Sequence, residues 1–407
     1  MLELASYAPE RLAFDPARVG GLATGDGRLR RPRASLVEPG QAVRITHVLD
    51  AVEPRVRPDG RAAFPGLTGP GQATGAGRVN ALAGVLVVPT MAFPAASQPL
   101  HEQEGIVDMA GPGMDCSCCG GARVVVLEAE PGAGATPSGV DQAMRSWALR
   151  TAEALASPTL DLEPDDVEVF RLDPVASSLP RVAALVQLAD LGELFRAYVE
   201  GRPAGQAELP RAVPPFAFLD GAVTNGDYHW AALANPTVAY QRNRLVMELA
   251  RSHGRRLALA GVVALRGYHQ RGQDKAAAAE EAAAAALGLG AEAVVITTEG
   301  GGNSHTDAML TVRACERAGM ASSVIAAEMA DPDSAAPSLT DWVPEARSIV
   351  SAGNAEEVVA GWSPALVLGG DRFLDGRPAT DDAPVPLRDY LGATCQLGDR
   401  YRMARTW

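Results

Sequence analysis

Three cysteines within four positions are the feature of this sequence most suited to chemistry. The loop reads Asp115-Cys116-Ser117-Cys118-Cys119-Gly120-Gly121. On an extended chain, Cys116 and Cys118 would point the same way, with Cys119 beside them. Such thiolates predict a site for Zn²⁺, Cu⁺ or an iron–sulfur cluster, although C-x-C-C is not a standard zinc spacing. Two other interpretations stay open: a redox or nucleophilic centre, or small core residues.

A glycine-rich stretch forms the second candidate site. It reads Glu299-Gly300-Gly301-Gly302-Asn303-Ser304-His305-Thr306-Asp307 and is predicted to leave a strand and enter a helix. Glycine lets backbone N–H groups approach a ligand, and a helix start favours a carboxylate or phosphate. Ser304 or Thr306 could instead cap the helix. His305 is a candidate general base or a metal ligand that completes the cysteine set, and the alternative is an exposed residue.

Two carboxylates, Glu104 and Asp108, flank the sequence Gly105-Ile106-Val107. Four residues apart on one strand, they would share a face and could bind a cationic amine. The alternative is a salt bridge to an arginine such as Arg55. His229 is a further acid–base or metal candidate.

Lys275 is the only lysine in the chain. It is therefore the single candidate for Schiff-base chemistry. Its alanine-rich surroundings, Asp274–Leu287, predict a solvated helix, and we expect no catalytic role for it.

The elements that would position these residues fall into two halves. Residues 1–130 are predicted to be β-rich and irregular, followed by a helix over Gly139–Ser157, two strands (Val167–Arg171 and Arg181–Gln187) and a helix over Leu188–Glu200. The proline-rich stretch Gly201–Pro215 predicts a boundary between domains 1–205 and 206–407. The second half predicts a doubly wound, mostly parallel α/β domain, whose ligands bind beyond the carboxyl ends of the strands. Its predicted elements are a helix capped by Asn235 and ending near Gly254, strand Leu257–Val263, helix Lys275–Leu287, strand Ala293–Thr298, helix Thr306–Ala318, and strands Ser322–Ala327, Ser348–Ser351 and Ala365–Leu368.

Composition narrows the class of protein. A net charge of −13 argues against nucleic acid or an anionic membrane as partner. No apolar run approaches the roughly 18 residues of a membrane span, and Met1–Pro16 lacks a signal-peptide pattern. We expect a cytoplasmic homo-oligomer, and five cysteines in such a chain do not predict a disulfide framework.

Several motifs, in order, resemble the substrate-binding proprotein of the glycine/sarcosine/betaine reductase component B family. The resemblance covers roughly residues 40–400 and implies a small amine or amino acid as substrate and a thiol or selenoprotein reductase as partner. In that family, a cysteine near the middle of the proprotein cuts the chain and becomes a pyruvoyl ketone, which binds the amine as an iminium. The motifs are Ile45–Val56, Phe64-Pro65-Gly66, Gln103–Gly113, Asp220-Gly221-Ala222-Val223, Asn235-Pro236, His253-Gly254, Glu299–Asn303 with Asp307, Gly353-Asn354-Ala355 and Gly392-Ala393-Thr394.

The sequence departs from the family at the residue that makes the ketone. After Val223 it reads Thr224-Asn225-Gly226-Asp227-Tyr228-His229, which places Tyr228 where the family has its cysteine. Tyrosine has no suitable leaving group on Cβ, and Thr224 lies four residues early. We therefore expect an uncut chain without pyruvoyl. The resemblance then implies substrate contacts at Tyr228, His229, Glu299, Gly301, Asn303 and Asp307.

Three functions remain open from the sequence. The first is an enzyme acting on a small amino acid or N-substituted glycine through the Cys116, Cys118 and Cys119 thiolates or a metal held by them. The second is a reductase subunit that works with a thiol or selenoprotein partner and needs no ketone. The third is a non-catalytic scaffold or partner-binding relative.

Overall fold

The computed structural model describes residues 1–23, 25–91, 104–176, 178–192, 196–227, 231–329 and 339–398. Tyr228 and His229 lie outside the described residues. The predicted α/β class is confirmed, because several sheets and helices alternate along the chain. No helix in the described part is long and apolar enough to cross a membrane.

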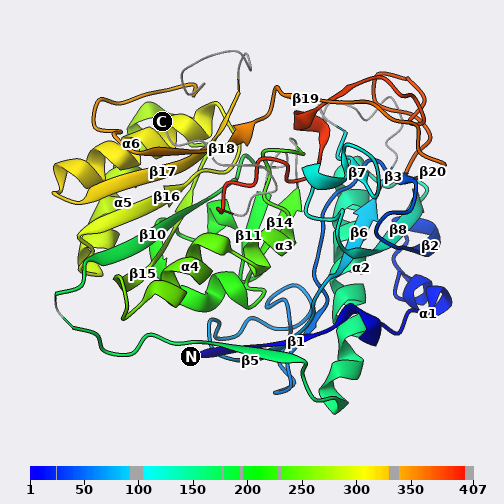
Figure 1. The fold of residues 1–407 in the computed structure, drawn as a ribbon, viewed down its shortest axis with the longest axis horizontal. Coiled ribbons are helices and arrows are strands. Elements are labelled where there is room, and N and C mark those ends of the chain that lie inside the picture. The colour runs from blue at the N-terminus through cyan, green and yellow to red at the C-terminus, as the bar shows by residue number, and fades with distance from the viewer. Residues whose placement is uncertain are drawn as a thin grey trace.

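A six-stranded sheet organises the second half of the chain (Figure 1). Five of its strands, β15, β10, β16, β17 and β18, run parallel to one another. The edge strand β13 pairs antiparallel with β15. The strands are rich in Val, Ile and Ala, as expected where both faces are covered. In spatial order they are β13 (Arg211–Val213), β15 (Ala258–Arg266), β10 (Arg181–Leu188), β16 (Ala293–Thr297), β17 (Ala321–Glu328) and β18 (Ile349–Asn354).

Helices cover both faces of this sheet. Alternate residues of β10 show the arrangement: Leu185 packs in one core cluster with α5 (Gly272–Gly288) and α6 (Asn303–Arg317). Val186 packs in another cluster with α4 (Arg244–Ser252). Strand β10 precedes the predicted boundary at 205/206 in the sequence, yet it pairs with strands that follow the boundary. The sheet therefore includes residues from both sides of the boundary, which stays a prediction.

The first half contributes strands to three smaller sheets, and its long helix α2 (Pro137–Ala156) packs against strands of two of them (Figure 1). Helix α2 is capped by Thr136 and buries Trp147, whose Nε1 donates to the Val19 carbonyl at 2.9 Å. Helix α1 is Pro16–Gly21. The sheets are β4 (Arg55–Val56), β5 (Gly77–Leu82), β1 (Leu2–Tyr7) and β9 (Asp166–Phe170); β2 (Leu29–Val37), β8 (Arg123–Pro131) and β6 (Val85–Thr90); and β20 (Leu366–Leu368), β3 (Val43–Ile45) and β7 (Val107–Asp108).

Two predicted helices are wrong, and one strand forms as predicted but in a different sheet. The helix predicted over Leu188–Glu200 contains strand β11 (Arg196–Val199), which pairs antiparallel with β14 (Val223–Asp227) and with β12 (Arg202–Pro203). The helix predicted from Asn235 is two helices, α3 (Thr237–Gln241) and α4, and Asn243 caps the second. Strand β20 leaves the second half and pairs with β3. A last pair joins β19 (Val358–Val359) and β21 (Val385–Pro386).

Candidate functional site

Glu299 ties together the carboxyl ends of the parallel strands. It follows β16, and its backbone N–H donates to Gln187 Oε1 on β10 at 3.1 Å. Its carboxylate accepts hydrogen bonds from the backbone N–H of Ala189 at 2.6 Å and of Asn235 at 3.0 Å. Burial raises the pKa of this carboxyl group. Glu299 therefore holds three chain segments at the edge where ligands bind in such sheets.

The glycines after Glu299 permit close packing of the loop. Gly300 has φ +84°, and a Cβ there would overlap the Tyr268 hydroxyl. A Cβ at Gly301 would overlap the Met329 sulfur, and the backbone N–H of Gly301 donates to the Tyr268 hydroxyl at 3.2 Å. Two of the glycines are thus required by protein neighbours, whatever ligand the loop holds.

Asp307 belongs to a buried polar cluster. Lys275 Nζ lies 3.0 Å from Asp307 Oδ2 and donates to the Asn303 carbonyl at 3.1 Å. His269 adds two contacts with the same carboxylate, from its backbone N–H and its Nδ1, both at 3.2 Å. Lys275 is only 6% exposed, so the predicted solvated position is wrong. The lysine instead joins α5 to the first turns of α6.

His305 is fully buried in the first turn of α6, so the interpretation as an exposed residue is wrong. Its Nδ1 accepts a hydrogen bond from the Thr340 backbone N–H at 3.3 Å, which places the proton of the neutral ring on Nε2. Nε2 has no hydrogen-bond partner within the described residues. Burial lowers the pKa of His305 to about 4, so the ring is neutral near pH 7.

A C-terminal segment, residues 392–396, clamps residues 231–235 onto the glycine loop. The backbone N–H of Gly392 donates to the Ala231 carbonyl at 2.7 Å, and Thr394 bonds the Ala232 carbonyl through its N–H and its hydroxyl. The Gln396 side chain donates to the Gly300 carbonyl at 3.2 Å. In turn, the Gly300 N–H donates to the Leu233 carbonyl at 2.9 Å. Residue 228 thus lies in the sequence between the end of β14 and a segment docked on the loop.

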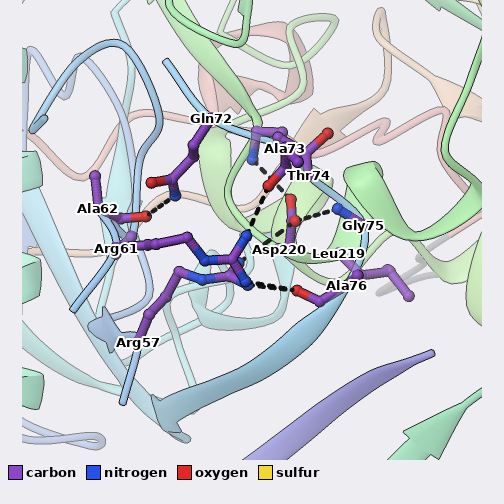
Figure 2. Close-up of polar contacts among 12 residues, drawn as sticks. Arg57, Arg61, Ala62, Gln72, Ala73, Thr74, Gly75, Ala76, Leu219 and Asp220 are labelled. Atoms are coloured by element: carbon purple, nitrogen blue, oxygen red, sulfur yellow. Dashed lines mark hydrogen bonds and ion pairs between the residues drawn. The ribbon is translucent and has the colours of Figure 1, made fainter. Parts of the chain in front are cut away.

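The approach to β14 rests on a buried ion pair (Figure 2). Arg57 Nη1 lies 3.5 Å from Asp220 Oδ2, and both side chains are inaccessible to solvent. The Asp220 carboxylate also accepts from the backbone N–H groups of Gly75 and Ala222, while Arg57 and Arg61 donate to the Ala76 carbonyl. Burial raises the pKa of Asp220 to about 6. The Asp220-Gly221-Ala222-Val223 motif is therefore a structural anchor for the strand.

The cysteine loop is not the extended segment expected from its spacing. Met114–Cys116 forms a 3-10 turn, and Cys116 is buried in a cluster with Tyr390. Cys119 is buried in a different cluster, and the Cys118 and Cys119 sulfur atoms lie 3.8 Å apart. Among the described residues, no three His, Cys, Asp or Glu side chains are placed to hold a metal ion. The arrangement does not support the thiolate–metal interpretation.

The two carboxylates expected to act together have separate partners. Asp108 is fully buried, pairs with Arg44 at 2.7 Å, and accepts from Trp362 Nε1 at 2.7 Å and the Tyr390 hydroxyl at 2.9 Å. Strand β7 holds only Val107 and Asp108, so Glu104 lies outside it. Its carboxylate accepts from the Leu374 backbone N–H and lies 3.4 Å from His47 Nδ1. Burial raises the pKa of Glu104 to about 7.

Several residues of this site escaped the sequence reasoning. Arg44, rather than the suggested Arg55, pairs with Asp108, and Arg55 pairs with Glu53. Gln187 and Gln396 hold the glycine loop, and nothing in their immediate sequence marks them. Their partners lie 112 and 96 residues away along the chain, so only the fold brings them together.

Comparisons with known proteins agree on one family. Residues 13–379 match the family model described as glycine/sarcosine/betaine reductase component B subunits. The chain is 29% identical to the glycine reductase complex component B subunits alpha and beta of Acetoanaerobium sticklandii, over 94% of this chain and 91% of the relative. It is 32% identical to the sarcosine reductase complex component B subunit alpha of Peptoclostridium acidaminophilum, over 82% of this chain and 77% of the relative. The betaine reductase complex component B subunit alpha of the same organism is 28% identical, over 84% and 79%. No solved structure matches the chain.

Proposed function

This chain belongs to the family of glycine/sarcosine/betaine reductase component B subunits, and on that premise we propose that it is the substrate-binding subunit of a reductase-type complex. Its substrate is a small amino acid or N-substituted glycine, as the names of the relatives suggest. Its partner is a thiol or selenoprotein reductase. The cytoplasmic location and the homo-oligomeric state remain predictions from the sequence.

The observation that carries the proposal is the docking of residues 231–235 on the glycine loop. This contact joins residues 231–235, which follow Tyr228 in the sequence, to the carboxyl ends of the parallel strands, where α/β sheets bind ligands. The start of α6, where His305 Nε2 has no partner within the described residues, supplies a neutral hydrogen-bond donor at the same edge. We assign the substrate to this edge, with His305 as its first candidate contact.

The subunit works uncut and without a pyruvoyl group. Thr224 is the one hydroxyl or thiol side chain in β14, and it lies in mid-strand opposite Tyr198. A cut before Thr224 would separate it from Val223 and divide a paired strand. The residues that the structure describes therefore do not fit the group that the family makes from its cysteine. The reaction must proceed without an iminium to a ketone of this chain.

Thiols, rather than a metal, are the chemistry that we retain for Cys116, Cys118 and Cys119. The absence of a converging ligand set among the described residues gives a metal no support. A half-exposed Cys118 beside the buried Cys119 is compatible with thiol exchange.

One observation favours a non-catalytic relative as the second candidate. The carboxylates Glu299, Asp307 and Asp108, which the sequence marks as substrate contacts, are each bonded to protein partners. A protein that had lost its reaction could keep all three for stability alone. Only a measurement of binding and turnover separates this candidate from the first.

The test is calorimetric binding of glycine, sarcosine and betaine to the full chain, paired with substrate-dependent turnover in the presence of a thiol or selenoprotein partner. We expect binding of at least one ligand and turnover that borohydride does not inhibit. In His305→Asn, affinity should fall about tenfold, the loss of one hydrogen bond, and the thermal midpoint of the variant, measured in parallel, establishes that the chain with this buried substitution is folded. His253→Asn, at the C-terminal end of α4, is the matched control. If no ligand binds at millimolar concentration and no partner-dependent turnover occurs, the proposal is wrong and the non-catalytic scaffold is the remaining interpretation.

A further inference from the structure

The Cys118–Cys119 pair has a geometry of its own, separate from the glycine loop and from Cys116. The two sulfur atoms lie 3.8 Å apart on adjacent residues. Cys118 is partly exposed, whereas Cys119 is completely buried. An accessible thiol beside an inaccessible one is the arrangement that lets the first attack a disulfide and the second resolve the product.

The loop backbone holds the pair in place. The Cys119 N–H donates to Ser117 Oγ at 3.3 Å, and its carbonyl accepts from the Ala122 N–H at 2.9 Å. A Cβ at Gly120 would overlap the Met114 carbonyl, so the turn closes tightly on its own start. A Cβ at Gly121 would meet no atom of the described residues within 4 Å, and Gly121 itself is exposed.

Cys116 is excluded from the pair by its surroundings. Its sulfur lies 3.9 Å from the Pro112 carbonyl and belongs to the cluster around Tyr390. Cys119 belongs to the cluster that includes Leu391. Within the described residues, Cys116 therefore packs in a different cluster from Cys118 and Cys119, which offers a matched internal control.

We propose that Cys118 and Cys119 form a reversible dithiol–disulfide couple that exchanges with a disulfide-containing oxidant. The Cys118 thiolate attacks one sulfur of the oxidant, a mixed disulfide forms, and one thiolate leaves and takes up a proton. The Cys119 thiolate then attacks the Cys118 sulfur and releases the second thiol. Two electrons and two protons pass from the pair to the oxidant, which is reduced to two thiols.

The couple is built to be re-reduced easily. Neighbouring Cα atoms are about 3.8 Å apart across a trans peptide, below the roughly 4.4 Å at which ordinary disulfides begin. The adjacent-residue ring is therefore strained, and strained disulfides are the labile and regulatory ones. The core links the couple to the segment that docks on the proposed substrate edge. Cys119 and Leu391 share a core cluster, and Gly392 next along the chain bonds to Ala231.

Two probes test the couple on the full chain. Phenylarsine oxide binds closely spaced thiol pairs, and we expect one equivalent to bind wild type and Cys116→Ser alike. Affinity should fall about 100-fold or more in Cys118→Ser and in Cys119→Ser, because a two-point attachment becomes one-point. Thermal midpoints of the variants establish that each is folded, and Cys118→Ala and Cys119→Ala replace any serine variant that is not.

Glutathione disulfide is the second probe. We expect the wild-type chain to lose the mass of two hydrogen atoms without retaining glutathione, and dithiothreitol to reverse the change. Cys119→Ser should instead retain one glutathione, because nothing resolves the mixed disulfide. Three results would overturn the proposal: arsenical binding that survives Cys118→Ser, arsenical binding that requires Cys116, or a wild-type chain that stops at the glutathione adduct.

Discussion

Removal of the Lys275 ammonium group should destabilise the protein strongly, because Lys275 pairs with Asp307 at 3.0 Å in a buried position. Breaking such a pair from one side costs about 3–5 kcal/mol, mainly because the other charge stays buried. Asp307 would keep its two contacts with His269. We therefore expect Lys275→Met to lower the free energy of unfolding by about 3 kcal/mol, at the lower end of that range.

A double-mutant cycle in urea at pH 7 measures this coupling. The cycle compares the loss of unfolding free energy in the double variant with the sum of the losses in Lys275→Met and Asp307→Asn. The double variant should lose at least about 1 kcal/mol less than that sum. Exposed Arg255→Met is the matched control for loss of a cation, with an expected change within about 0.5 kcal/mol. A loss below about 1 kcal/mol for Lys275→Met, or strict additivity, would refute the reasoning.

The single lysine allows an independent readout. An amine-specific acetylating reagent can modify only Lys275 and the N-terminal amine. In native buffer the N-terminus should react and Lys275 should not, whereas both should react in urea. Equal native reactivity would show that the ammonium group is exposed and that the calculation above has no basis.

Three further predictions concern the uncut chain and two buried carboxyl groups. The intact mass of the purified chain should be that of one 42.3 kDa polypeptide, and two fragments with this sum would contradict the uncut chain. Burial raises the pKa of Glu104 from 4.5 to about 7, and burial also lowers the pKa of the neighbouring His47. Ionisation of Glu104 therefore destabilises the fold as pH rises from about 4.5 to 7. Glu104→Gln should remove this loss. Its free energy of unfolding relative to wild type, measured in urea, should rise by about 3 kcal/mol over that interval. A difference that does not change with pH would contradict the prediction. Asp220→Asn should cost about 3 kcal/mol in the same assay, because the buried Arg57 would keep only the more exposed Asp59 carboxylate, at 3.7 Å, as an ion-pair partner. A change below about 1 kcal/mol would show that the Arg57–Asp220 pair is dispensable.

Local patterns were sufficient to predict much of the second half of the fold. Strand β16 and helices α5 and α6 lie within three residues of their predicted bounds, since apolar runs alternate there with helical stretches that end at glycine. Strand β11 was predicted as a helix because its partner β14 lies more than 20 residues further along the chain. The alternating burial of Ala197 and Val199 and the tight turn at Gly201 into β12 are the local signs of a strand.

The same limit explains the errors at the site. An alanine-rich helix has no polar face, so its sequence does not reveal which side is buried, and Lys275 was placed in solvent. Its buried side, with Ala279 and Ala282, follows from the contact with α6. Burial of His305 depends likewise on Thr340, 35 residues away. Candidate residues could be found from composition and spacing, whereas their partners could not.

The motifs through which the chain resembles its family describe a scaffold more than a reaction. Asp220, Glu299 and Asp307 are each held by several protein groups, and each joins segments distant in sequence. Substitution of any of them will therefore report first on stability, and a loss of activity there would not establish a catalytic role. The departures from the family carry the distinguishing information. The sequence predicts Tyr228 in place of the residue that makes the family's ketone, and the proposed Cys118–Cys119 couple would supply thiol chemistry that a ketone-dependent subunit does not need. Experiments on these positions, with stability measured in parallel, separate a changed mechanism from a lost one.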